Sequence, residues 1–256
     1  MTTMIENDDE RPDLERRFGG LRRLWGAEGY QRVRAARVAV IGVGGVGSWA
    51  AEALARCGVA ELTLIDLDHV SESNVNRQIQ ALGSTLGAAK VSVLRDRLLD
   101  IHPGCQIRTV EDFVTPENWP ALLPAPVDAV LDACDQTKAK RALMVWAMQT
   151  RQRLVTVGAA GGKLHADKAQ VADLADVTHD PLLSGLRQQL RRDGWPRQGA
   201  MGVRCVYAAE PVLPAQGLCE SDGTLGCHGY GSSVMVTATF GMVAAGELLE
   251  QIRLQM

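Results

Sequence analysis

Short apolar runs alternate with helix-like patterns along much of the chain. The apolar runs, which predict buried strands, span 38–41, 62–65, 106–110, 127–131 and 154–158. The intervening patterns predict helices at 49–57, 90–99 and 138–151. Strands that alternate with helices at this spacing form a mainly parallel sheet with helices on both faces. The pattern therefore predicts a doubly wound, Rossmann-like α/β fold.

The two ends of the chain follow other patterns. Residues 14–34 predict a helix before the sheet, and we expect Gly19-Gly20 to interrupt it. Beyond Gly161-Gly162 the predicted elements are a strand at 171–174, a helix at 181–192, a strand at 203–209, a loop at 211–226 and a closing helix at 231–255. The most apolar stretch, 234–249, contains threonines and Glu247 and is too short for a membrane span, so it predicts a buried helix.

These patterns predict one domain, over 14–256, with a smaller C-terminal extension. Within it we expect a nucleotide-binding core at 14–165, a substrate-facing segment at 166–230 and the closing helix at 231–256. The polar, acidic residues 1–13 predict a disordered tail and fit neither a signal nor a transit peptide.

Composition adds few constraints. The chain has 256 residues, of which 46% are hydrophobic, and this is enough for a sizeable core. A net charge of −3 gives no overall attraction for nucleic acid, so such binding would need a local basic patch. The six cysteines form no CxxC pair, which argues against zinc and against a disulfide framework. We therefore expect a reduced, cytoplasmic setting and no membrane association.

A glycine-rich turn carries the first chemical signal. Gly42, Gly44, Gly45 and Gly47 follow the first strand and precede a helix, an arrangement in which backbone N–H groups can approach phosphate. Asp66 ends the second strand, where its carboxylate can accept hydrogen bonds from both hydroxyls of a ribose. Taken alone, these features also fit an NAD(P)-dependent oxidoreductase.

Cationic and amide groups after Asp66 favour a triphosphate over a dinucleotide. They are Asn74, Asn76, Arg77 and Gln78 in one short segment, together with Lys90 at the start of a helix. A guanidinium can bind phosphate oxygens and neutralise charge in a transition state. Asp135, after the fourth strand, is preferred over Asp132 as a ligand for Mg²⁺, whereas Asp68 fits a metal site or an ordinary loop equally well. These residues predict adenylation with ATP and Mg²⁺.

The same residues carry a resemblance to a known superfamily. The chain resembles E1-like, ubiquitin-activating-type adenylating enzymes in GVGGVG at 42–47, LIDLD at 64–68, NVNRQ at 74–78, Lys90 and the region of Asp135. Within that superfamily, it is similar to the tRNA threonylcarbamoyladenosine dehydratase branch in RFGGLRRLWG at 17–26, GAAGGKLHAD at 158–167 and GTLGCHGYGSSVMVTATFG at 223–241.

The resemblance implies roles and partners. Asp66 would hold the ribose of ATP, Arg77 and Lys90 its phosphates and Asp135 the magnesium. Arg17 or Arg23 would act on the ATP of the partner subunit in a homodimer. The implied reaction is the ATP-dependent dehydration of N6-threonylcarbamoyladenosine at position 37 of tRNA, through an acyl-adenylate that closes a ring. A monovalent cation and a cysteine-desulfurase or sulfur-acceptor partner are also compatible with the resemblance.

The chain departs from the sulfur-carrier branch of the superfamily. That branch commonly holds zinc with two CxxC pairs, which this chain lacks, so adenylation of the C-terminus of a ubiquitin-like sulfur-carrier protein is the second hypothesis. Cys227-His228 could be a reactive pair, but a packed turn is favoured. His165 could move a proton or be structural.

A basic segment could contact tRNA. Its residues are Arg187, Arg191, Arg192, Trp195 and Arg197. Four guanidinium groups can bind backbone phosphates, and the tryptophan offers a surface on which a base could stack. A solvated charged face is the alternative.

Overall fold

The fold is built around one seven-stranded sheet. The computed structural model describes residues 12–214 and 230–255. The strands are β1 (Arg37–Ile41), β2 (Glu61–Ile65), β3 (Gln106–Val110), β4 (Ala129–Asp132), β5 (Arg153–Val157), β6 (Ala169–Asp173) and β7 (Arg204–Ala208). Their order in the sheet is β3-β2-β1-β4-β5-β7-β6, and every neighbouring pair is parallel except β6 with β7. The predicted mainly parallel α/β sheet is confirmed.

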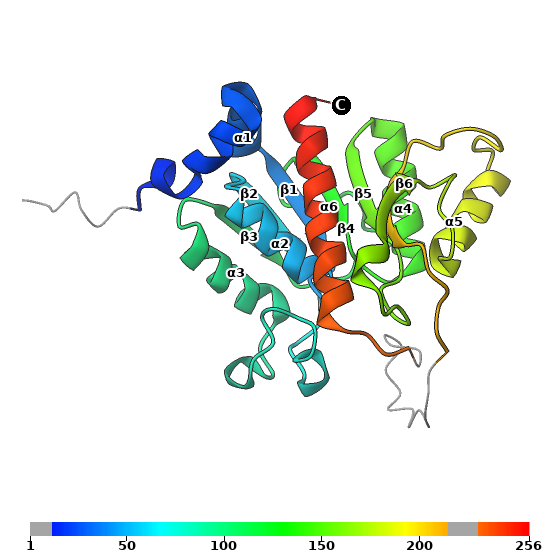
Figure 1. Cartoon of the computed structure of the whole chain (residues 1–256), viewed down its shortest axis with the longest axis horizontal. Helices are drawn as coiled ribbons and strands as arrows, with labels where there is room; N and C mark the ends of the chain where they lie inside the picture. Colours follow the sequence, from blue (N-terminus) through cyan, green and yellow to red (C-terminus); the bar gives the residue numbers. More distant parts are fainter. Residues whose placement is uncertain (1–11, 215–229, 256) are drawn as a thin grey trace, which may run out of the picture.

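Helices cover both faces of the sheet. They are α1 (Leu14–Ala35), α2 (Gly47–Arg56), α3 (Lys90–Ile101), α4 (Thr137–Thr150), α5 (Pro181–Arg192) and α6 (Val234–Leu254), with short 3₁₀ turns η2 (Glu72–Asn74), η3 (Gly83–Thr85) and η4 (Ala166–Lys168). Residues of α2, α3 and α6 share one core, and residues of α4 and α5 share the other. Figure 1 shows α6 crossing the middle of the sheet.

Alternation along the strands explains why there are two cores. Val38 and Val40 of β1 point into the core beneath α2 and α6, whereas Ala39 and Ile41 point into the core beneath α4 and α5. A strand that is buried on both faces is apolar throughout, as this one is. The order of the strands reverses at β1, because its neighbours are β2 on one side and β4 on the other. Ligands bind in such sheets at the carboxyl edge of this switch point.

The closing helix depends on a very close approach to α2. A Cβ at Gly241 would lie 2.5 Å from the carbonyl oxygen of Val46 and 2.9 Å from the backbone nitrogen of Ala50. Only glycine fits there, so α6 can lie against the first turn of α2. In the described part of the chain, no helix is long and apolar enough to span a membrane.

The structure differs from the sequence-based prediction in α1 and places one predicted strand at the edge of the sheet. The break expected at Gly19-Gly20 is wrong, because α1 runs through both glycines and its irregular backbone is at Gly26 (φ 73°, ψ 168°). A glycine costs a helix roughly 1 kcal/mol, and the burial of Phe18 beside the pair offsets part of this cost. The strand expected at 171–174 belongs to β6, which joins the same sheet as the strands of the nucleotide-binding half. The division at 165 and 230 stays a prediction, and residues 1–11 lie outside the described range.

A buried histidine anchors α1 to the body of the protein. The Nη1 of Arg34 donates to the backbone oxygen of Gly58 and lies 3.0 Å from the Nε2 of His102. Because a guanidinium only donates, Nε2 must be the acceptor, and the imidazole is neutral. The ring of Phe18 packs edge-on against His102 at 4.7 Å and under Arg34 at 4.8 Å. Burial, reinforced by the charges of Arg34 and Arg17, lowers the pKa of His102 from 6.5 to about 4.

This anchor makes stability depend on pH. Between pH 6.5 and about 4, the unfolded chain binds a proton at His102 that the folded chain does not. The stabilisation is therefore complete above pH 6.5 and is lost as the pH falls, by up to about 1.4 kcal/mol per pH unit. Urea unfolding across this range should show a shallower pH slope for His102→Gln than for the wild type. Equal slopes would contradict the role of His102.

Candidate active site

The glycine turn between β1 and α2 is shaped by backbone contact. Gly42 has φ 79°, and a Cβ there would lie 2.9 Å from the backbone nitrogen of Cys134. At Gly47 a Cβ would lie only 1.8 Å from the carbonyl oxygen of Gly42. The two glycines therefore allow the turn to fold tightly between the ends of β1 and β4 and bring α2 directly onto it.

The turn presents donors at the start of α2. Within the described residues, the backbone N–H groups of Gly44, Gly45 and Val46 make no hydrogen bond. No side chain caps α2, and the only atom within 4 Å of a Cβ at Gly44 would be the Nε2 of Gln78, at 3.8 Å. Unsatisfied N–H groups at the N-terminus of a helix suit an anion. The turn can therefore accommodate phosphate oxygens.

Asp66 holds the neighbouring loop in place. Its carboxylate accepts hydrogen bonds from the backbone nitrogens of Val43 (2.8 Å) and Asp68 (2.9 Å). Burial raises the pKa of this carboxyl, while the charge of Lys90 and the two hydrogen bonds act in the opposite direction. Each carboxylate oxygen can accept more than one hydrogen bond, so ribose hydroxyls could still bind.

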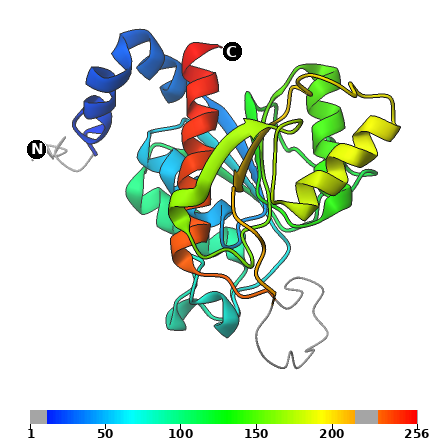
Figure 2. The same cartoon turned by 45° about the vertical axis from the view of Figure 1, so that its right-hand side comes forward.

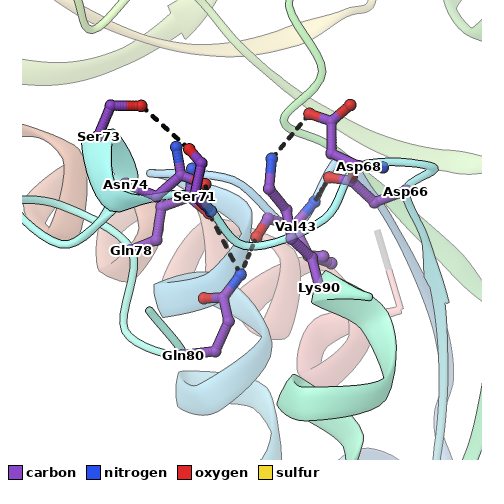
Figure 3. A network of polar contacts seen from close by, with 9 residues as sticks. All are labelled: Val43, Asp66, Asp68, Ser71, Ser73, Asn74, Gln78, Gln80 and Lys90. Carbon is purple, nitrogen blue, oxygen red and sulfur yellow. Dashed lines mark hydrogen bonds and ion pairs between the residues drawn. The ribbon is translucent and has the colours of Figure 1, made fainter. Parts of the chain in front are cut away.

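Lys90 brings a buried positive charge to the same edge. It is the first residue of α3 and only 5% exposed, and its ammonium lies 2.7 Å from the carboxylate of Asp68. Figure 3 shows Lys90 beside Asp68 and Asp66, next to the backbone of Val43. The structure thus gives Asp68 a definite contact, with Lys90, whereas the sequence could not decide its role.

Arg77 lies over the glycine turn. A Cβ at Gly45 would be 3.3 Å from the Cγ and Cδ of Arg77, so the absence of a side chain there makes room for the arginine. The guanidinium of Arg77 donates to the carbonyl oxygen of Ser73 (2.6 Å) and to the Oδ1 of Asn76 (3.0 Å). The backbone oxygen of Arg77 accepts a hydrogen bond from the indole of Trp49 (2.9 Å). The contacts with the loop orient the guanidinium, and the contact with α2 holds the backbone of Arg77.

The amides around Arg77 have separate tasks. Asn74 is buried and accepts a hydrogen bond from the backbone nitrogen of Ser71 (3.1 Å), so it shapes the loop. Asn76 donates to the carbonyl oxygen of Ser232, just before α6, which ties the loop to the closing helix. Gln78 is buried beside Gly44.

Sequence reasoning missed Gln80. Its amide donates to the carbonyl oxygen of Val43 (2.8 Å) and to the side chain of Gln78 (3.4 Å), as Figure 3 shows. Its Oε1 is buried without a partner among the described residues. Because Asp66 accepts from the backbone nitrogen of Val43 and Gln80 donates to its carbonyl oxygen, the peptide groups on both sides of Val43 are held. No local motif marks Gln80, and only its place just after NVNRQ could have suggested it.

A fully buried ion pair supports the end of β4. The ammonium of Lys140, on α4, lies 3.1 Å from a carboxylate oxygen of Asp132 and donates to the carbonyl oxygen of Val157 (2.7 Å). The same carboxylate accepts from the hydroxyl of Thr156 and from the backbone nitrogen of Cys134. Burial works against the charge of Lys140, but the Asp132 carboxylate outweighs it and leaves the lysine pKa raised. No local sequence pattern indicates this pair.

The pair separates the roles of two aspartates. Asp132 is committed to Lys140, whereas Asp135 is exposed in the turn that leads into α4. That turn packs against Gly42, whose missing Cβ leaves room for the backbone of Cys134. Of the two aspartates Asp135 is the more accessible, and its role as a metal ligand stays a prediction.

The residues present suit a magnesium ion that arrives with a triphosphate. Among the described residues, no three His, Cys, Asp or Glu side chains form a group able to hold a metal by themselves. Mg²⁺ is commonly held by one or two carboxylates together with phosphate oxygens and water, so an exposed Asp135 beside the phosphate-accepting turn is an adequate protein ligand.

The two candidate arginines of α1 are far from this edge in the same chain. α1 precedes β1 and therefore lies at the opposite end of the sheet from the 66–90 loop, as Figure 1 shows. Arg17 donates to the carbonyl oxygens of Asp100 (3.3 Å) and Ile101 (2.7 Å) at the end of α3. Arg23 is exposed, and its side chain makes no hydrogen bond or ion pair with another described residue. Of the two, Arg23 is thus the more available to a partner subunit.

Of the remaining candidates, His165 lies within the described residues, whereas Cys227 and His228 do not. The backbone nitrogen of His165 donates to Glu210 (3.0 Å), which fixes the position of the histidine next to the buried Lys163. Burial lowers the pKa of Lys163, whose ammonium donates to the carbonyl oxygens of His179 and Glu210.

Fold and site together define an adenylation-type α/β protein, and comparison with known families agrees. A model described as the ThiF family matches residues 19–253. Because this match covers most of the chain, the protein belongs to the ThiF family. The E1-like resemblance of the sequence is thereby confirmed.

Individual relatives are similar over nearly their full length. The chain is 41% identical over 253 residues to the tRNA threonylcarbamoyladenosine dehydratase of Escherichia coli (strain K12), covering 92% of this chain and 93% of that protein. It is 38% identical over 246 residues to the dehydratase of the same name from Haemophilus influenzae, covering 94% of each. The crystal structure of the E. coli enzyme in complex with ATP matches with a TM-score of 0.86 and 40% identity, over 95% of this chain and 97% of that one.

The buried pair of Asp132 and Lys140 gives a stability prediction. Lys140→Met should destabilise the protein by about 3–5 kcal/mol, because it leaves Asp132 buried and unpaired. Lys138→Met, two residues earlier on the same helix and exposed, is the matched control and should change stability by less than about 0.5 kcal/mol. Urea unfolding measures both, and equal stabilities of the two variants would contradict the assignment.

Proposed function

We propose that this chain is an ATP-consuming enzyme that dehydrates N6-threonylcarbamoyladenosine at position 37 of tRNA. One observation carries the proposal: the ATP-bound E. coli dehydratase matches 95% of the chain at a TM-score of 0.86. The glycine turn, Asp66, Arg77 and Lys90 support it, because they lie at one edge of the sheet with the donors and charges that a nucleoside triphosphate needs. Adenylation of a carboxylate is the reaction that these groups suit.

In the proposed first step, a carboxylate oxygen of the threonyl group attacks the α-phosphorus of ATP and pyrophosphate leaves. The N–H groups of the turn and the guanidinium of Arg77 stabilise the charge that spreads over the phosphate oxygens. Lys90 exchanges its contact with Asp68 for one with a phosphate oxygen. Asp66 holds the ribose and so fixes the α-phosphate relative to the turn. Asp135 holds Mg²⁺, which neutralises phosphate charge when bound.

In the proposed second step, the product mixed anhydride loses AMP. The ureido group of the same modified base attacks the activated carbonyl carbon, the bond from that carbon to the AMP oxygen breaks, and a ring closes. A tethered nucleophile reacts at a high effective concentration, so no second substrate is needed. The sum of both steps removes one water from the base and converts ATP to AMP and pyrophosphate.

Further parts of the proposal concern assembly and setting. In a homodimer, Arg23 of one protomer would reach the triphosphate bound by its partner, since it cannot reach the nucleotide edge of its own chain. A tRNA substrate and the absence of paired cysteines fit a reduced, cytoplasmic setting. The chain is also similar to the adenylyltransferase and sulfurtransferase MOCS3 of Drosophila willistoni. The identity is 28%, and the match covers 90% of this chain but only 42% of that protein.

The proposal is tested on tRNA that carries threonylcarbamoyladenosine. After incubation with enzyme, ATP and Mg²⁺, mass spectrometry of the digested nucleosides should show a loss of one water, with one AMP formed per dehydrated base. Arg77→Ala and Lys90→Ala should each lower the rate of AMP formation by at least about 10²-fold, the usual cost of removing a group that stabilises developing charge.

Controls separate the alternatives. Arg95→Ala removes a partly exposed charge, which pairs with Asp96, from the same helix as Lys90 and should leave the rate unchanged. Unchanged nucleosides would refute the proposal, and AMP formation only with a small protein that ends in Gly-Gly would favour adenylation of a sulfur carrier. Binding of NADH without turnover of ATP would favour an oxidoreductase, and full activity of both variants would refute the phosphate roles of Arg77 and Lys90.

A further inference from the structure

The C-terminal end of α5 forms an open hollow. Each residue that lines it has a long side chain that ends in hydrogen-bond donors. Its volume is about 590 Å³, and its lining residues are Gln188, Arg191, Arg192 and Arg197. No carboxylate lines it. Three guanidinium groups around one hollow repel one another, and an anion in the hollow would remove that repulsion.

The nearest acidic residue does not neutralise the hollow. Asp193 follows directly after α5, but its carboxylate accepts hydrogen bonds from the Nη2 (2.5 Å) and Nε (3.1 Å) of Arg141 on α4. Within the described residues, Arg191, Arg192 and Arg197 form no ion pair. The Nε of Arg191 is buried without a hydrogen-bond partner among them. The hollow therefore has an unbalanced positive charge.

Two other residues of the basic segment serve the fold instead. Arg187 donates to the carbonyl oxygens of Leu174 (3.1 Å) and Val177 (2.7 Å), which ties α5 to the loop after β6. Trp195 is half-buried and packs against the core beneath α4 and α5. Of the residues expected from the sequence to contact tRNA, the three arginines of the hollow are therefore the most available. Packing covers part of the ring of Trp195, which leaves less of its face for a base to stack on.

The position of the hollow limits what it can contact. α5 begins at the carboxyl edge, where Asp180 accepts a hydrogen bond from the backbone nitrogen of Ala159 just after β5, and its 12 residues span roughly 18 Å. The chain beyond α5 leads to the start of β7, at the amino edge. In Figures 1 and 2 this segment runs along the side of the molecule opposite the 66–90 loop. A ligand that touches both places must be large.

We infer that the hollow of Arg191, Arg192 and Arg197 binds backbone phosphates of tRNA at a distance from the nucleotide that is modified. This inference rests on the proposed function, which supplies an extended polyanion as substrate. Guanidinium groups match phosphate oxygens in geometry and charge, and phosphate contacts position an RNA without reading its sequence. The hollow thereby supplies affinity and orientation, while the carboxyl edge supplies the chemistry.

The hollow should bind the substrate and the transition state equally well. The backbone phosphates that it contacts are far from the modified base and do not change during the reaction. Removing such contacts raises KM and leaves kcat unchanged. Each phosphate contact also releases counterions, so its loss lowers the slope of log K against log salt concentration by roughly 0.7–0.9. These two effects separate the inference from a merely structural role of α5.

The test uses the full-length triple variant R191Q/R192Q/R197Q and two probes: tRNA with threonylcarbamoyladenosine and an unmodified transcript of the same tRNA. Dissociation constants are measured over a range of salt concentrations. We expect the variant to bind both probes at least about tenfold more weakly, with a salt slope smaller by about 2. The KM for modified tRNA should rise by a similar factor at unchanged kcat.

Two controls make the outcome unambiguous. R95Q removes one partly exposed charge from α3, on the other face of the sheet, and is compared with R192Q alone. R192Q should lower the salt slope, whereas R95Q should not. Unchanged salt slope and KM in the triple variant, with wild-type dehydration intact, would overturn the inference and leave the proposed function standing. If the wild type binds both probes with the predicted slope but dehydrates neither, the proposed function fails and the phosphate contacts remain. A variant that loses kcat at unchanged KM would also overturn the inference.

Discussion

The structure depends on how closely the backbone packs where β1 turns into α2. Gly42 lies against the loop after β4, Gly47 lies against Gly42, and Gly241 brings α6 onto the same turn. Any side chain at these positions would push apart three elements that all meet at the carboxyl edge of the sheet. Asp66 and Gln80 then hold the two successive peptide groups that flank Val43. The result is a closely packed turn whose N–H groups at 44–46 make no hydrogen bond within the described residues, and a preorganised set of donors stabilises developing charge without having to reorganise.

Much of this arrangement could be predicted from the sequence, because its signals are local. The β-branched runs define the strands, the glycines define the turn, and Asp66, Arg77 and Lys90 each follow a recognisable element end. The carboxyl edge of a parallel sheet then brings these residues together without further information.

Contacts between segments far apart in the chain could not be predicted. The Asp132–Lys140 pair, the bond from Gln80 to Val43 and the commitment of Arg187 to the loop after β6 have no local pattern. The irregular backbone at Gly26 was not predicted, because the adjacent glycines 19 and 20 are the stronger local indication of a helix break. Tertiary packing, with Phe18 buried beside them, keeps the helix continuous there.

The two ends of the sheet have different tasks. The carboxyl edge holds the nucleotide-binding groups and the exposed Asp135, and the amino edge holds α1 and the hollow at the end of α5. Arg23 therefore has a role in this chemistry only through a second copy of the chain, and the hollow only through a substrate long enough to reach it. Both requirements follow from the direction in which the strands run, and the proposed function, in a homodimer that acts on tRNA, would meet both.

The central claim is that ATP activates the carboxylate of the modified base, and isotope transfer tests this claim most directly. The substrate is tRNA whose threonylcarbamoyl carboxylate carries ¹⁸O at both oxygens. Attack of that carboxylate on the α-phosphorus, followed by ring closure, places one labelled oxygen in AMP and leaves the other in the cyclic product. Mass spectrometry of the AMP should therefore find one ¹⁸O per molecule. Unlabelled AMP, or label in pyrophosphate instead, would contradict the account.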